Sequence, residues 1–501
     1  MLDLIDFHSN IRTRQHRHTT LFLEKNRVVV AEASGDFIDT LFSFLTLPLG
    51  TIIRLLLNNQ QHDHPAEFGC ISNLYRSVEN SSVEVFWNHI CKQMLLRPQN
   101  NCESLCRKLK LNVDDTESLR YFMCSNCKRG SNWLLSTFTG ASCCSCGKSM
   151  DKEMKLFGDS EDETHTDGVF VKGEAMYFIF DDLRVLQSSP NNFVKELTQL
   201  GYRNFHKFID ISPCVGLKEI LDLLKQALTS KSALSDVFFA YGDSLGMCTF
   251  SPKIGPKHEE PGFDFGVSIN LKVILRKSKK KIVYAEAEGD FVDFLFSFLT
   301  APIGSILNLL DGYSSLGCID NLYKSVKELN SSRLTITRPS GTPLLDTRVA
   351  PQFGYRRQPL KLPEEDTPSY WYGRGLIKNS ICYVNPNGVV SKKRSLVENP
   401  DAMKLFDPRS PNGTRELAVG FVKRPSLFVV WDDLKVMPLA NASSICFIQK
   451  MNLPLDDLEE HVLCIREVEA LNLLRASLTS KAALTEGLSY LLENPNQDAK
   501  A

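Results

Sequence analysis

The chain contains one long motif twice. Residues 31–50 read AEASGDFIDTLFSFLTLPLG and residues 285–304 read AEAEGDFVDFLFSFLTAPIG, which gives fifteen identities in twenty positions. The second block starts 254 residues after the first (285 minus 31). The repeats of solenoid proteins are only roughly 20 to 50 residues long. The sequence therefore predicts a duplicated domain rather than a solenoid.

Further motif pairs follow in the same order along both parts of the chain. We therefore expect an α+β fold with two homologous mixed α/β domains in tandem, packed against each other as an intramolecular pseudo-dimer. The pairs are GCISNLYRSV (69–78) with GCIDNLYKSV (317–326), FDDLRV (180–185) with WDDLKV (431–436), and LTSKSAL (228–234) with LTSKAAL (478–484).

Composition between the motifs sets the expected domain boundaries. The stretch between the two copies is rich in Gly, Pro and Ser, which is typical of a linker. The predicted parts are an atypical basic tail (1–18), a first copy (19–240) with a zinc-ribbon-like insertion (about 121–150) and an acidic loop (159–167), the linker (241–263), a second copy (264–490) and a C-terminal tail (491–501).

Each copy is expected to begin with a hairpin of two strands. The basic run RKSKKK (276–281) lies at the turn of the second hairpin, where the first copy has Lys25, Asn26 and Arg27. On its own, such a run could also indicate a nuclear signal or a phosphate-binding patch. Because both copies have charged residues at this turn, we interpret it as a solvated hairpin tip.

A buried helix pair is expected after each hairpin. Asp36 and Asp290 precede apolar residues at helical spacing, so we predict that they cap these helices, with Asp39 and Asp293 near the positive end of the helix dipole. The uncharged stretch 294–310 is short for a membrane span, which needs roughly 20 apolar residues, and it contains Pro302. We expect no membrane span here.

Charge and cysteine content limit the classes of partner and compartment. The net charge is −1, with 43% apolar and 23% charged residues, so no overall basic field attracts nucleic acid. The fifteen cysteines are an odd number, and the first ten residues lack the pattern of a signal peptide. These features favour a reducing compartment, the cytoplasm or the nucleus.

Four cysteines form the one motif with a clear chemistry. Cys124 and Cys127 are separated by fifteen residues from Cys143 and Cys146, the C-x2-C-x15-C-x2-C spacing of a four-cysteine zinc site. Each C-x2-C pair can direct two thiolates at one tetrahedral ion. Cys144 leaves the third ligand ambiguous. Four protein ligands leave no open position, so we expect structural zinc, while four apolar, metal-free cysteines remain the simpler alternative.

The sequence contains no nucleophile elbow, phosphate loop or dinucleotide fingerprint. The polar residues shared by both copies include the adjacent aspartates 181–182 and 432–433, which we interpret as solvated hairpin turns rather than a cation site. Cys70 and Cys318 are the one candidate nucleophile present in both copies, and a buried cysteine is the simpler interpretation.

The repeated motifs resemble those of a plant family known as domain of unknown function 674. The resemblance rests on the AEA-x-x-DF-[IV]-D-x-LFSFLT-x-P-[LI]-G block, the GC-I-x-NLY-[KR]-SV block, the FVK and DDL segments and the LTSK-x-AL ending, and extends from about Thr19 to Leu492. It implies a plant source and two tandem copies. It implies no activity, substrate or catalytic residue.

Two classes of function are compatible with these features. We favour a non-enzymatic binding or regulatory protein, in which the zinc-braced first copy presents a surface to a protein partner. The alternative is an enzyme or small-molecule binder of plant specialised or defence metabolism that uses a cleft between the two copies. A pocket gathering Asp181, Asp182, Lys172 or Cys70 with their counterparts would favour the alternative.

Overall fold

The structure of the chain is a computed structural model. It describes residues 19–493 outside the segments 60–67, 128–132, 159–167, 204–207, 240–266, 338–341, 378–379, 382–387, 411–412, 414–419, 440–448 and 450–452. The predicted basic tail, acidic loop and linker therefore lie outside the described residues.

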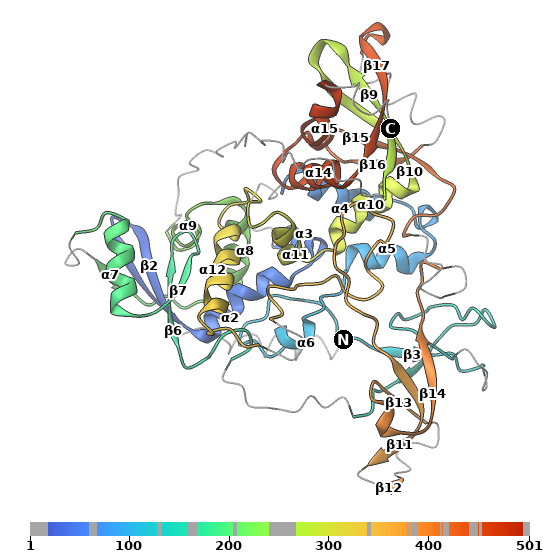
Figure 1. The fold of residues 1–501 in the computed structure, drawn as a ribbon, viewed down its shortest axis with the longest axis horizontal. Helices are drawn as coiled ribbons and strands as arrows, with labels where there is room; N and C mark the ends of the chain where they lie inside the picture. The colour runs from blue at the N-terminus through green and yellow to red at the C-terminus, as the bar shows by residue number, and fades with distance from the viewer. Residues whose placement is uncertain are drawn as a thin grey trace.

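Two antiparallel five-stranded sheets occupy opposite ends of the molecule (Figure 1). The first sheet has the order β7-β6-β2-β1-β8 and the second β16-β15-β10-β9-β17, so corresponding motifs occupy corresponding strands. The strands of the first sheet are β1 (Thr19–Glu24), β2 (Arg27–Ser34), β6 (Met176–Phe180), β7 (Val185–Gln187) and β8 (Ile209–Ile211). Those of the second are β9 (Ile269–Arg276), β10 (Lys281–Glu288), β15 (Leu427–Trp431), β16 (Val436–Pro438) and β17 (Leu458–Ile465).

Both predicted hairpins are present. Lys25 and Asn26 join β1 to β2 with positive φ angles of 51° and 60°, the geometry of a tight two-residue hairpin turn. In the second hairpin the basic run forms the short 3-10 helix η3 (Lys277–Lys279) between β9 and β10. The interpretation of this run as a hairpin tip is thereby confirmed.

The buried helix pairs connect the two halves at the centre of the molecule. The first pair is α2 (Gly35–Ser43), which continues into η1 (Phe44–Thr46), and α3 (Leu49–Asn58); the second is α10 (Gly289–Thr300) and α11 (Ile303–Leu309). Between the pairs, the Leu49 amide donates to the Ala301 carbonyl and the Ile303 amide donates to the Leu47 carbonyl, both at 3.0 Å. Equivalent residues of the repeated motif thus contact each other across this centre.

The predicted N-caps of these helices were misplaced. The cap positions are Ser34 and Glu288, so Asp36 and Asp290 lie in the first helical turn. There the negative charge of each aspartate still interacts favourably with the positive end of the helix dipole.

Among the described residues, no helix is long and apolar enough to cross a membrane.

The remaining helices cover the sheets and fill the space between them (Figure 1). They are α4 (Ile71–Asn80), η2 (Val83–Val85), α5 (His89–Leu96), α6 (Glu103–Cys106), α7 (Pro190–Gln199), α8 (Leu217–Thr229), α9 (Ala233–Phe238), α12 (Ile319–Ser331), η4 (Arg394–Leu396), η6 (Leu455–Asp457), α14 (Glu467–Thr479) and α15 (Ala483–Glu493).

Helices α4 and α12 each pack against the sheet that the other half of the chain forms. Helix α4, from the first half, lies beside β16 of the second sheet, and α12, from the second half, lies beside β7 of the first (Figure 1). The Asn73 side chain donates to the Asp433 carbonyl at 2.9 Å, and Asn321 donates to the Asp182 carbonyl at 2.9 Å. Each half of the chain thus places one helix beside the sheet of the other half, an arrangement that we call the helix exchange.

Other residues of the repeated motifs support the same exchange. The Ser77 hydroxyl accepts from the Val436 amide at 3.0 Å, and Ser325 accepts from Val185 at 2.9 Å. Because the same bonds form twice with the halves interchanged, the GC-I-x-NLY and DDL motifs serve the exchange.

The glycine that precedes each exchanged helix allows close approach to the opposite half. Gly69 and Gly317 have positive φ, and a Cβ on Gly69 would lie 2.5 Å from the Leu478 carbonyl oxygen. On Gly317 it would lie 2.7 Å from the Ala227 carbonyl oxygen. Neither backbone oxygen can move without disturbing its helix.

Buried carboxylates hold the loops at residues 169–171 and 421–424, one in each half. Asp39 accepts from the Val169, Phe170 and Val171 amides at 2.7 to 2.8 Å. Its counterpart Asp293 accepts the amides of residues 421 and 422 at 2.8 and 3.0 Å, and the Arg424 guanidinium at 2.6 Å. Desolvation raises the pKa of Asp39 to about 6 and that of Asp293 to about 7.

Each of these loops then pairs with the segment that follows the exchanged helix. The Ile336 amide donates to the Phe170 carbonyl at 2.8 Å, and the Trp87 amide donates to the Phe421 carbonyl at 3.2 Å. Asp39 and Asp293 thus hold the backbone to which the opposite half binds.

We predict that Gly69→Ala and Gly317→Ala each lower the free energy of unfolding by about 3 kcal/mol or more, since both φ strain and a backbone clash result. Gly201 is the matched control, because it has a φ of 86° but no atom within 4 Å of the position that a Cβ would take. Gly201→Ala should cost only about 1 kcal/mol. Urea denaturation measures the difference, and equal losses would contradict the close approach.

Asp39 should also make stability depend on pH. Its folded pKa is raised from 3.8 to about 6, so between these values the folded state binds more protons than the unfolded state. The free energy of unfolding therefore falls as pH rises from about 4 to about 6, by roughly 2 to 3 kcal/mol from this group. Asp39→Asn should remove that part of the slope in urea titrations at several pH values.

Asp36→Asn is the control for this measurement, because Asp36 lies on the same helix with its side chain exposed and paired with Lys110. The attribution of this pH dependence to Asp39 would be contradicted if the slope of the free energy of unfolding against pH were unchanged in Asp39→Asn. It would also be contradicted if both variants lost the slope equally.

Candidate metal centre

A third group of strands carries the cysteine motif and joins the two halves. β11 (Tyr370–Ile377) pairs with β12 (Ser380–Ile381), β13 (Val389–Ser391) and β14 (Val397–Leu405), and β14 pairs in parallel with β4 (Trp133–Leu135) of the first half. The short strands β3 (Tyr121–Met123) and β5 (Lys152–Met154) form a two-stranded ribbon beside them. The predicted insertion is thus part of a module built from both halves.

Two loops of this module carry the four thiols. Cys124 directly follows β3, and Cys127 lies three residues further along. Cys143 and Cys146 lie in a tight turn, in which the Gly147 amide donates to the Cys143 carbonyl at 2.8 Å and the Cys143 amide donates to the Lys148 carbonyl at 2.8 Å. Gly147 has a φ of 71°, which favours glycine.

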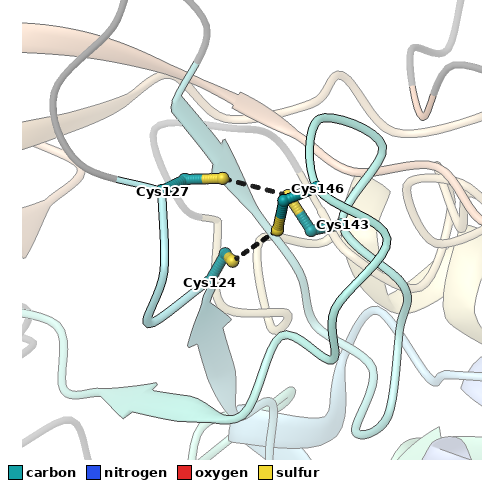
Figure 2. A group of neighbouring side chains, drawn as sticks. All are labelled: Cys124, Cys127, Cys143 and Cys146. Carbon is teal, nitrogen blue, oxygen red and sulfur yellow. Dashed lines mark hydrogen bonds between the residues drawn. The ribbon is translucent and has the colours of Figure 1, made fainter.

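The four sulfur atoms converge on one point, as Figure 2 shows. All lie within 4.8 Å of one another, with Cys124 to Cys146 at 3.4 Å and Cys127 to Cys143 at 3.5 Å. Tetrahedral zinc with Zn–S bonds of about 2.3 Å places its sulfurs about 3.8 Å apart. The cluster therefore has the size that a four-thiolate ion requires.

Backbone amides in the first loop favour the thiolate form. Desolvation acts to raise the pKa of Cys124, but hydrogen bonds from the Asn126 and Cys127 amides and from neighbouring thiols together lower it to about 7. Neighbouring thiols act in the opposite direction on Cys127 and raise its pKa to about 12. A cation bound among the four sulfurs would relieve this crowding of negative charge.

Cys144 is separate from the cluster. It is exposed, and its sulfur lies beside Gly413, where an added Cβ would be only 2.5 Å away. Of the two cysteines that the spacing left open as third ligand, Cys143 is the one whose sulfur lies with the other three.

Ion pairs and polar contacts hold the two loops in place. The Arg120 guanidinium donates to both carboxylate oxygens of Glu153, at 3.0 and 2.6 Å, across the ribbon of β3 and β5. The Ser125 hydroxyl donates to Asp151 at 2.8 Å, so the first thiol loop is linked to the segment after the second. These contacts hold the two loops in the arrangement that brings the thiols together.

Aromatic packing links the thiol loops to the second half. Trp133 stacks on Tyr372 with ring centroids 4.8 Å apart, and Tyr121 packs against Tyr370 at 5.6 Å. The Phe406 amide also donates to the Leu135 carbonyl at 2.8 Å. These contacts join β3 and β4 to β11, β14 and the residue that follows β14.

The repeated aspartate pairs lie in the turns of the hairpins β6–β7 and β15–β16, as the sequence predicted, but the first aspartate of each pair is not solvated. Asp181 accepts from the amide and the hydroxyl of Ser235 at 2.8 and 2.9 Å, and Asp432 does the same with Thr485. Desolvation raises the pKa of Asp432 to about 6. Each aspartate anchors the start of the last helix of its half.

The shared cysteines are buried, as expected. The Cys70 thiol donates to the Ser480 carbonyl and the Cys318 thiol to the Ser230 carbonyl, both at 2.9 Å. Desolvation raises the pKa of each thiol to about 12, so neither is a ready nucleophile.

Sequence reasoning missed one buried ion pair. Arg409 and Asp407 have side chains only 3% and 0% exposed, and the guanidinium donates to Asp407 at 2.8 Å. The loop that carries them accepts, at the Pro408 carbonyl, a hydrogen bond of 2.8 Å from Asn88 of the first half. The signal was present as a DPR tripeptide, but nothing in its pattern indicates burial.

The fold and the thiols define a class: an α+β protein with two five-stranded sheets and a candidate four-cysteine metal centre. The chain belongs to the family described as "Protein of unknown function (DUF674)", whose model matches residues 20–468. The family resemblance of the motifs is thereby confirmed. Neither the curated proteins nor the solved structures contain a match to the chain.

We predict that the metal-free protein binds one Co²⁺ and develops the visible and thiolate charge-transfer absorption of tetrahedral four-sulfur coordination. Cys127→Ser and Cys146→Ser should weaken binding at least about tenfold and change the spectrum, because each removes one sulfur from the set. Cys144→Ser is the matched control and should leave both unchanged. An equal effect of Cys144→Ser would contradict the assignment of ligands.

Proposed function

We propose that this chain is a non-enzymatic binding or regulatory protein in which structural zinc, held by Cys124, Cys127, Cys143 and Cys146, braces the junction between two duplicated halves. The observation that carries the proposal is the convergence of four thiols within 4.8 Å beside strands that pair with the second half. Four thiolate ligands saturate zinc, so the ion would act as a brace rather than as a catalyst.

The duplication is part of this proposal. The two sheets have the same strand order, and repeated motifs occupy the same strands in each. Two tandem copies that pack as a pseudo-dimer account for both observations. The boundaries proposed for the copies are those expected from composition, 19–240 and 264–490.

The hydrogen bonds of the shared polar residues support a binding protein over an enzyme. Asn73 and Cys70 donate to backbone carbonyls of the second half, and their counterparts Asn321 and Cys318 donate to those of the first. Asp432 and Asp181 each anchor a helix of their own half. The repeated residues thus form two separate structural junctions. The alternative of an enzyme using a cleft between the copies draws no support from these residues.

The exposed turn from Cys144 to Ser149 is the surface that we propose for a protein partner. It is carried by the zinc loop, so its shape would depend on the bound ion. Nucleic acid is not the proposed partner, because the chain has a net charge of only −1. We propose a cytoplasmic or nuclear location, where thiols stay reduced.

We predict about one zinc per chain by plasma mass spectrometry of the purified protein. Cys124→Ser and Cys143→Ser should each lose the metal and melt at a temperature lower by about 5 °C or more, since the brace of the β4–β14 junction is lost. Cys214→Ser, at an exposed cysteine far from the cluster in sequence, should keep both. A wild-type protein without metal, or variants that lose metal without any loss of stability, would overturn the proposal.

A further inference from the structure

The contacts between the halves have the pattern of a two-fold complex between separate molecules. In such a complex, residue i of one partner contacts residue j of the other, and the reverse contact also forms. Here Asn73 contacts Asp433 while Asn321 contacts Asp182, and Leu49 contacts Ala301 while Ile303 contacts Leu47. Each bond has a counterpart with the halves interchanged.

The exchanged helices lie between the two halves, and their apolar residues are buried. Helix α4 contacts α10 and β16 of the second half and α3 and α5 of the first, while α12 contacts α2 and β7 of the first half and α11 of the second. Leu74 and Val78 of α4 are both 0% exposed, as are Leu322 and Val326 of α12. Burying side chains of this size contributes roughly 1.5 to 3 kcal/mol each. Because each helix packs against elements of both halves, separating the halves would remove part of the packing around it.

Backbone pairing adds specificity to this association. The Lys172 amide donates to the Leu334 carbonyl at 3.1 Å, and the Lys423 amide donates to the Val85 carbonyl at 2.8 Å. These two bonds again have the halves interchanged, and both would be lost if the halves separated. The interface therefore resembles the interior of a single folding unit more than a contact between two domains that fold independently.

The covalent connection between the halves is the segment 240–266. A tether of this kind acts only by raising the effective concentration of one half near the other, typically to the millimolar range. The interface among the described residues includes two exchanged helices and a shared strand module.

We propose that the two halves form a complementation pair, in which each half is the specific binding partner of the other and the connection through 240–266 is dispensable once the protein has folded. The partner that this surface fits is the opposite half of the chain. This inference does not depend on zinc, because the exchanged helices lie at the sheets and not at the thiol module.

The test begins with the full-length folded protein, carrying a site for a specific protease in place of residues 250–256. After cleavage, the two fragments should remain a 1:1 complex of unchanged mass in light scattering coupled to size exclusion, even at nanomolar concentration. Separation or precipitation of the fragments on cleavage would overturn the proposal.

Asn73→Ala combined with Asn321→Ala tests the interface itself. In the cleaved protein, loss of both cross-half hydrogen bonds should raise the dissociation constant of the fragments about 30-fold. Asn191→Ala, on the exposed surface of α7, is the matched control and should leave it unchanged. If the double variant and the control bind alike, the exchanged helices do not hold the halves together.

Adding a chelator to the cleaved complex separates this inference from the proposed function. Fragments that stay associated after loss of metal support complementation whether or not zinc is the native ion. Fragments that dissociate as soon as metal is removed would show that the thiol module, and not helix exchange, provides the association.

Discussion

The exchange of α4 and α12 is the constraint on which the other features of this protein depend. Each helix lies beside a strand of the other half and has its apolar residues buried, so the packing around it involves both halves. The positions that serve this exchange are those that the chain repeats: a glycine that permits close approach, a cysteine and an asparagine that donate to carbonyls, and a serine that accepts an amide. Repetition of the motifs is thus explained by geometry, without reference to a reaction.

The thiol module adds a second connection that lacks this symmetry. Only the first half supplies the four cysteines, while the second half supplies β11 and β14, against which β4 packs. A bound ion would stabilise loops that are too short and too polar to form a core of their own. The proposed zinc brace therefore lies in the strand module, which both halves form but which does not follow the two-fold arrangement of the two sheets.

Local features of the fold could be predicted from the sequence. The hairpin tip at Lys277–Lys279 and the buried helix pair follow from charge and from apolar spacing, and the C-x2-C pairs indicate convergent thiols. The exchange could not be predicted, because two copies of one motif pack equally well in their own half or in the other. Asp181 illustrates the same limit. A pair of aspartates at a turn suggests solvent, and only the distant Ser235 shows that one of them is an anchor.

The most direct test of the exchange asks which sheet α4 contacts. A photo-reactive benzoylphenylalanine at position 79, an exposed site near the end of α4, would be activated in the folded protein, and the cross-linked peptides mapped by mass spectrometry. The exchange predicts cross-links within one chain to the turn and strand at residues 432–438. Cross-links to the equivalent residues 181–187 would show that each half keeps its own helix, and would contradict the exchange.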